Sequence, residues 1–327
     1  MESFFIVGGL FLAWAFGRNN ISNLFGAAVF TRMVTLKTAT CIAILFVLLG
    51  ALLSSAGPSS SMLQLGHPDT MAEAFVITVS AGIVLFGMTS WGIPISIAQA
   101  MVGATIGFTL AQGGFFPKNI MQKTISAWCI SPFLGAGVAF VVFKAMRWWL
   151  KCCPMKLLSR DLFTRGGLIC VGAFSAYALG ANNVATISAP FVGASQWPLE
   201  AIGLIVCVAV GVGFISADKK VIRTMGSGLF PLSPLEALIV VFSGALTLFL
   251  FSWGGLKNML DYYHLPSFPL VPVPITIATI GSIIGVSFAK GGYGLRWSML
   301  INILFSWLIT PLLSALLCWG IMTIWLV

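Results

Sequence analysis

Two short polar segments, each inside a long apolar stretch, hold the residues of this chain best suited to chemistry. Residues 17–23 read Gly-Arg-Asn-Asn-Ile-Ser-Asn, and residues 180–186 read Gly-Ala-Asn-Asn-Val-Ala-Thr. About 13 residues precede Gly17 in its apolar stretch, which at about 1.5 Å per helical residue places the first segment near the middle of a bilayer. Matching polar breaks in the two halves of a membrane protein indicate a binding site between the halves.

The residue types indicate which ligand such a site would take. Glycine lets the backbone leave helical geometry, and Asn and Ser side chains can bond the groups this frees. We therefore expect each segment to interrupt its helix, so that a half-helix starts there and directs N–H groups at an anion. The alternative is a buried cluster of interhelical hydrogen bonds that binds no ligand. Duplication of an Asn-Asn pair beside glycine favours the binding site.

Composition defines the class of protein around these segments. The chain has 327 residues, of which 59% are hydrophobic and 8% charged, and its mean hydropathy is +1.03. So little charge cannot cover a soluble surface, and an all-α polytopic membrane protein is expected. The net charge of +9 is explained by cytoplasmic loops rather than by nucleic acid. The seven cysteines show no metal-ligand spacing and lie mostly alone in apolar runs.

The apolar segments that position the two polar segments belong to two copies of one repeat in the sequence. Matching pairs early in the two halves, such as Gly50 and Gly213, lie closer in sequence than later pairs, such as Gly103 and Gly281, and the extra residues lie in a polar loop around 257–270. We expect a first repeat at 1–150, a basic cytoplasmic linker at 151–165 and a second repeat at 166–327. The expected apolar segments are 4–31, 38–56, 71–91, 94–112 and 124–143, then 166–194, 199–217, 233–253, 272–289 and 298–327.

Charge predicts how the repeats sit in the membrane. Five segments per repeat would make the second copy enter the bilayer from the opposite side. With both termini outside, thirteen Lys and Arg residues fall in cytoplasmic loops and three in external loops. This imbalance favours inverted repeats, with broken helices and hairpins at the midplane. Short loops and the absence of an evident targeting signal suggest a prokaryotic plasma (inner) membrane.

The same motifs resemble a known family. The duplicated Gly-x-Asn-Asn segments are similar to the GANDVANA-type signature of the inorganic phosphate transporters, the PiT or PHO4 family. Residues 92–99 (Gly-Ile-Pro-Ile-Ser-Ile-Ala-Gln) resemble the GLPVSTTH-like hairpin of that family, with a degenerate second copy at 271–276. Its closing Trp…Pro segments resemble residues 127–132 and 306–311. The resemblance covers nearly the whole chain in the same order.

The resemblance implies phosphate import coupled to Na⁺ or H⁺, with sulfate as the substrate of some members. It also implies that motif and hairpin residues bind substrate. Carried over by position, these are Asn19, Asn20, Asn23, Ser96, Asn182, Asn183, Thr186 and Thr276, to which we add Arg18 and Gln99.

The chain also departs from the family pattern. Asn20 and Asn183 stand where Asp is usual, Gln99 replaces a His, and Arg18 replaces a small residue. A carboxylate suits Na⁺, whereas an amide supplies no charge and takes up no proton. We therefore expect no cofactor and a coupling ion that is H⁺ rather than Na⁺. Arg18 could replace the coupling cation; equally, its guanidinium could snorkel or bond backbone carbonyls.

The substrate and the functional class follow from the same residues. Phosphate carries protons that need acceptors and sulfate carries none, so the lost carboxylates favour sulfate while the family favours phosphate. We expect phosphate, with a Na⁺-independent sulfate permease as the alternative. An enzyme is disfavoured because the apolar segments hold no acidic pair or His; a non-transporting membrane subunit is a remote alternative. The expected partners are the anion and the bilayer, with a homodimer as an assembly to test.

Overall fold

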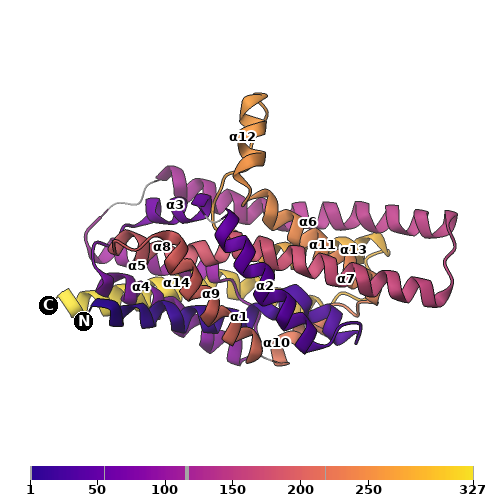
Figure 1. Ribbon diagram of the computed structural model, residues 1–327, viewed down its shortest axis with the longest axis horizontal. Coiled ribbons are helices and arrows are strands. Elements are labelled where there is room, and N and C mark those ends of the chain that lie inside the picture. Colours follow the sequence, from indigo (N-terminus) through magenta and orange to yellow (C-terminus); the bar gives the residue numbers. More distant parts are fainter. Residues whose placement is uncertain (1, 55, 115–117, 218, 327) are drawn as a thin grey trace.

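The computed structural model describes residues 2–54, 56–114, 118–217 and 219–326, and its regular elements over these residues are all helical (Figure 1). In chain order these are η1 (Glu2–Phe5), α1 (Ile6–Phe30), α2 (Leu36–Ser54), α3 (Ala56–Leu65), α4 (Met71–Ser90), α5 (Ile97–Ala111), α6 (Lys118–Cys152), α7 (Leu157–Leu179), η2 (Gly180–Val184), α8 (Ala185–Ala194), α9 (Leu199–Ile215), α10 (Lys219–Arg223), η3 (Thr224–Gly228), α11 (Pro234–Leu250), α12 (Gly254–Tyr262), α13 (Ile275–Ala289) and α14 (Trp297–Leu326).

The predicted all-α polytopic architecture is confirmed. Among the described residues, five helices are long and apolar enough to cross a membrane, or six if the bent pair α11 and α12 forms one span. The helices α5 and α13 have only 15 residues each. At about 1.5 Å per residue they reach about 22 Å, short of an apolar bilayer core of about 30 Å. Each follows a non-helical stretch, so each starts inside the protein.

The first polar segment does not interrupt its helix, and the expectation of two half-helices was wrong. The helix α1 runs unbroken from Ile6 to Phe30, and the second segment forms one π-helical turn, η2, between α7 and α8. Asn20 Nδ2 donates to the backbone oxygen of Phe16 four residues earlier (3.2 Å), which satisfies the amide within the helix. Gly17 serves close packing instead: a Cβ there would lie 2.2 Å from the backbone oxygen of Val210.

The helices of the two halves pack in a reciprocal pattern. The helix α5 lies along α14, and α6 lies along α13. A Cβ added to Gly103 would meet the backbone of Pro311 at 2.2 Å, and one added to Gly281 would meet that of Pro132 at 2.1 Å. Likewise α1 packs on α4 and α9, while α7 packs on α11 and α2. Two inverted repeats would produce this pattern, but the repeat boundaries remain a prediction.

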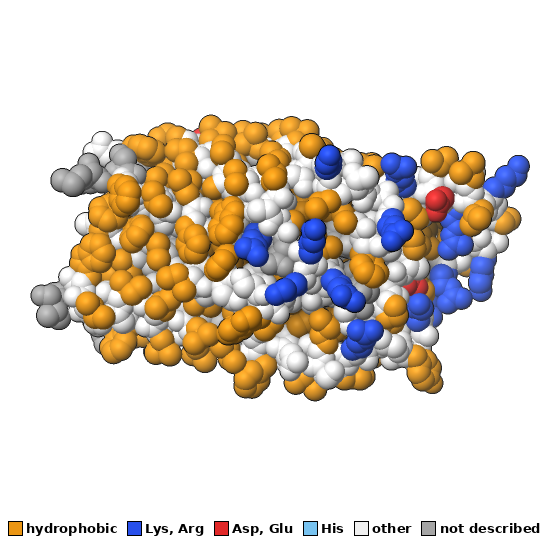
Figure 2. All heavy atoms as spheres, turned by 90° about the horizontal axis from the view of Figure 1, so that it is seen from below, with side chains coloured by type: hydrophobic (Ala, Val, Ile, Leu, Met, Phe, Trp, Pro, Cys, Tyr) orange, Lys and Arg blue, Asp and Glu red, His pale blue; other side chains and the backbone are white. Residues whose placement is uncertain are grey.

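Both chain ends lie at one end of the molecule, and the junction of α6 and α7 lies at the other (Figure 1). The expected linker at 151–165 is largely helical, because α6 extends to Cys152 and α7 begins at Leu157. On the face shown in Figure 2, Lys and Arg gather over the half that holds this junction, and hydrophobic side chains cover the other half. This gathering of positive charge agrees with the predicted orientation, in which the junction of α6 and α7 is cytoplasmic. The short helix α12 projects from the body and has no buried residue.

Replacing Gly281 by Ala is expected to lower the thermal unfolding midpoint in detergent by about 5 °C, because the added methyl meets the rigid backbone of Pro132 and overpacking costs about 1–3 kcal/mol. Gly320→Ala is the matched control on a long helix, since a Cβ there meets nothing within 4 Å. It should keep or slightly raise the midpoint through helix propensity. Equal midpoints for the two variants would contradict close packing at Gly281.

Candidate functional site

A chain of hydrogen bonds joins the first polar segment to two loops. We call residues 91–96, between α4 and α5, the first hairpin loop, and residues 271–274, before α13, the second hairpin loop. Asn23 Nδ2 donates to Asn20 Oδ1 (2.7 Å) and to Thr276 Oγ1 (3.1 Å). Thr276 Oγ1 in turn donates to the backbone oxygen of Ile95 (3.3 Å). Since all four residues are buried, α1 and both halves of the chain meet at one buried point.

Two helices begin at this point. The side chain of Ser96 caps α5 by accepting from the backbone N–H of Gln99 (3.3 Å), and Thr276 lies in the first turn of α13. The start of a helix carries a partial positive charge and unpaired N–H groups, which favour a bound anion. The helix starts expected at the polar segments are therefore supplied by the hairpin loops instead.

The second polar segment holds the second hairpin loop. Asn182 Nδ2 donates to Ser252 Oγ (3.1 Å) and to the backbone oxygen of Val271 (3.2 Å), and its Oδ1 accepts from the backbone N–H of Val273 (3.1 Å). Thr186 Oγ1 donates to the backbone oxygen of Asn182 (2.9 Å), within its own helical run. Thr186 is thus bonded locally rather than to a loop.

Four buried amide atoms, on the two polar segments and on the first turn of α5, have no hydrogen-bond partner among the residues that the structure describes. They are the acceptors Asn19 Oδ1, Asn23 Oδ1 and Gln99 Oε1 and the donor Asn183 Nδ2, and we call these four residues with Asn20 the amide cluster. Each of the five residues is at most 3% exposed. An unpaired buried polar group costs about 1–3 kcal/mol, so a ligand that offers both donors and acceptors would recover that cost.

The side chain of Arg18 packs against two aromatic rings. Its guanidinium carbon sits 5.3 Å from the ring centre of Phe86 and 5.8 Å from that of Trp14, and the two rings stack on each other. A cation over aromatic faces is already stabilised electrostatically. This position lends no support to Arg18 as a ligand of the anion, which remains a prediction from the sequence.

We expect Arg18→Gln to leave the KM for phosphate within about twofold of the wild type, because the guanidinium lies over aromatic rings rather than among the amides. Initial uptake rates measured across a range of phosphate concentrations would check this. A KM raised tenfold or more would place the guanidinium in contact with the substrate.

Sequence reasoning missed the groups that bind the motif amides. Asn19 Nδ2 donates to Thr89 Oγ1 (2.8 Å), as Asn182 does to Ser252. Thr89 follows Asn19 at the same sequence separation as Ser252 follows Asn182, so the repeat could have identified both partners. The acceptor at Ile95 is a backbone oxygen, which leaves no mark in a sequence.

Comparison with known proteins identifies the family of the chain. A sequence model of the phosphate transporter family matches residues 16–318. One relative is a phosphate permease of Methanocaldococcus jannaschii, 22% identical over 95% of this chain and 94% of the relative. Another is a low-affinity inorganic phosphate transporter of Rhizobium meliloti, 26% identical over 76% of this chain and 74% of the relative. The names of both relatives are themselves inferred.

A solved structure, that of a sodium-dependent phosphate transporter, aligns with a TM-score of 0.77 over 98% of this chain and 97% of that chain. The two sequences are 20% identical, so this likeness speaks for the fold alone. The match to the family model extends over nearly the whole chain, including both polar segments and both hairpin loops. This protein therefore belongs to the phosphate transporter family.

Proposed function

We propose that this protein is a secondary transporter of inorganic phosphate that works by alternating access around the amide cluster. The observation that carries the proposal is the mixture of unpartnered groups on buried side chains there, which includes the acceptor oxygens of Asn23 and Gln99 and the donor NH₂ of Asn183. Phosphate near neutral pH carries one or two protons that donate to such acceptors, while its other oxygens accept from N–H groups. Sulfate has no proton to donate and would leave the amide oxygens unpaired, so the cluster fits phosphate better.

The charge of the anion would be balanced without a carboxylate–cation pair. The starts of α5 and α13 supply partial positive charge, and every side chain in the amide cluster is neutral. The cluster contains no carboxylate, so none of its side chains would hold Na⁺ or take up a proton. We therefore propose Na⁺-independent transport driven by a proton gradient, with the proton carried on the phosphate itself. The resemblance to transporters, together with the absence of a nucleophile–base arrangement among the described amides, favours a carrier over an enzyme.

Uptake of radiolabelled phosphate and sulfate into proteoliposomes tests this function. We expect saturable phosphate uptake that rises with an inward proton gradient and does not change when Na⁺ replaces K⁺. Unlabelled sulfate should compete poorly. Sulfate uptake faster than phosphate uptake would overturn the substrate assignment, stimulation by Na⁺ would overturn the coupling, and uptake of neither anion would overturn both.

A further inference from the structure

The two hairpin loops are held differently, although the repeats place equivalent residues around them. In the second half, Asn182 binds the backbone of Val271 and Val273 through both ends of its amide. The equivalent residue in the first half is Asn19, and the alignment of the two hairpin loops makes Ile93 and Ile95 its equivalent targets. Asn19 Oδ1 has no hydrogen-bond partner among the described residues. One loop is therefore clamped by its asparagine and the other is not.

Two tryptophans repeat the same difference. Trp128 Nε1 on α6 donates to the backbone oxygen of Pro272 in the second hairpin loop (2.9 Å). Its equivalent on α14 is Trp307, whose equivalent target is Pro94 in the first hairpin loop. Trp307 Nε1 is buried and has no partner among the residues described. The two bonds from Asn182 and the one from Trp128 at the second loop thus have no counterpart at the first loop among the described residues.

The helices beneath the two loops pack alike, so the difference belongs to the loops. A Cβ on Gly107 would meet the backbone oxygen of Ala315 at 2.1 Å, and one on Gly285 would meet that of Ala136 at 2.2 Å. The pairs Gly103–Pro311 and Gly281–Pro132 agree as closely. The helix α5 therefore sits on α14 as α13 sits on α6. What differs is whether the preceding loop is fastened to the tryptophan helix.

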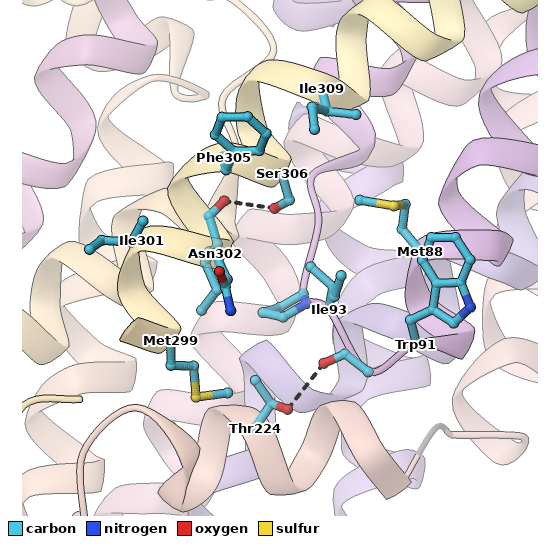
Figure 3. Close-up of a pocket in the computed structure, with 13 residues that line it drawn as sticks. Met88, Trp91, Ile93, Thr224, Met299, Ile301, Asn302, Phe305, Ser306 and Ile309 are labelled. Carbon is cyan, nitrogen blue, oxygen red and sulfur yellow. Dashed lines mark hydrogen bonds between the residues drawn. The ribbon is translucent and has the colours of Figure 1, made fainter. Parts of the chain in front are cut away.

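A cavity lies between the first hairpin loop and α14, on the side where the bond from Trp307 is missing. It has a volume of about 600 Å³, and its walls are the first hairpin loop on one side and α14 on the other (Figure 3). Pro94 lines it, and the next residue is Ile95, whose backbone oxygen binds Thr276 beside the amide cluster. Thr224, which directly follows the basic helix α10, also lines the cavity and donates through Oγ1 to the backbone oxygen of Gly92 (3.0 Å). By the predicted orientation α10 lies on the cytoplasmic side.

We propose that these residues form two reciprocal latches. The second latch is the pair Asn182 and Trp128; their hydrogen bonds to the second hairpin loop are formed in this structure and close the external path. The first latch is the pair Asn19 and Trp307; their hydrogen bonds to the first hairpin loop are not formed in this structure, and the cytoplasmic path is open. In the opposite state of the carrier, Trp307 Nε1 donates to the backbone oxygen of Pro94, and the Asn19 amide bonds the backbone of Ile93 and Ile95. The hydrogen bonds of the second latch are then broken. This inference rests on the alternating access proposed above and names the groups that fasten each gate.

Matched substitutions test the latches because the same chemical change should act in opposite directions. Trp128→Phe removes a bond made only in the state described here, and Trp307→Phe removes one made only in the opposite state. The reporter is a cysteine at Ile120, which is buried here. Ile120 precedes Trp128 by the same separation as Met299, a residue of the cavity wall, precedes Trp307. The exposed native cysteines are first replaced by Ser, namely Cys41, Cys129, Cys152, Cys153 and Cys170.

The measurement is the rate at which a maleimide labels Ile120→Cys in purified protein in lipid nanodiscs. We expect Trp128→Phe to raise this rate about fivefold and Trp307→Phe to lower it about fivefold, the factor that corresponds to about 1 kcal/mol for one buried hydrogen bond. A cysteine at Met299, on the wall that is already open, should be labelled within twofold of its own rate in both variants, which shows that each is folded.

Two results would overturn the latches: a change of the same sign in both variants, or no change in either. The labelling contains no phosphate and requires no uptake. A chain that fails to transport phosphate can therefore still show opposite shifts, and a chain that transports phosphate can still lack them. The proposed function and the latches thus fail separately.

Discussion

Asn23→Ala is expected to lower phosphate uptake into proteoliposomes about 100-fold, because it removes the side chain that joins α1 to α13. Asn23 Nδ2 bonds both Asn20 Oδ1 and Thr276 Oγ1, and all three side chains are buried. Removing the amide leaves each partner short of a donor at about 1–3 kcal/mol apiece, and two such losses correspond to factors from about 30 to above 1,000. Initial rates per amount of purified protein give the measurement.

The control is Asn258→Ala, which truncates the same residue type where it is exposed on α12. It should leave uptake unchanged. Uptake by the Asn23 variant at more than a third of the wild-type rate would mean that the hydrogen-bond chain between α1 and the loops holds the fold without taking part in transport.

Asn183→Asp is expected to abolish phosphate uptake in Na⁺-free medium, and added Na⁺ is expected to restore it. Asn183 is 1% exposed in the π-helical turn, and its Nδ2 has no hydrogen-bond partner in the described part of the chain. The substitution keeps the shape, removes a donor and adds a buried negative charge. With an effective dielectric constant of about 20, two like charges about 5 Å apart repel by about 3 kcal/mol, which is more than 100-fold in rate. A bound Na⁺ would offset that charge, because carboxylate oxygens are hard ligands.

The measurement is uptake as a function of Na⁺ concentration with K⁺ as the replacement ion. Asn183→Leu serves as the control, because it also lacks the donor but adds no charge, so Na⁺ should not restore its uptake. If Asn183→Asp keeps full activity without Na⁺, the position does not face the anion.

Much of the fold could be predicted because its signals are local or repeated. Apolar runs fixed where helices lie: segment 71–91 became Met71–Ser90, and segment 199–217 became Leu199–Ile215. Helix starts carry local signals as well: Glu73 and Glu236 stand in the first turns of α4 and α11 and form capping boxes with Thr70 and Ser233. The repeat also selects pairs that occupy matching environments, as Asn19 and Asn182 do with Thr89 and Ser252.

What could not be predicted depends on tertiary contacts. Glycine beside Asn-Asn reads as a break, yet Gly17 and Gly180 are close-packing positions, because backbone oxygens of Val210 and Val47 lie against them. The sequence does not distinguish a glycine that bends its own helix from one that admits another helix. Arg18 presents a similar ambiguity: its neighbours Trp14 and Phe86 come from two helices, α1 and α4, so its stacking could not be inferred from the motif.

The crossed packing of the halves has a consequence for biogenesis. The glycine face of α5, at Gly103 and Gly107, packs against α14, a helix of the second half that is synthesised long after α5. Thr276, which completes the hydrogen-bond chain begun by Asn23, is also synthesised late. The first half must therefore wait in the membrane with a polar segment and a small-residue groove uncovered. A chain that ends before α14 should therefore be less stable than the full chain, because the backbone of α14 no longer covers Gly103 and Gly107.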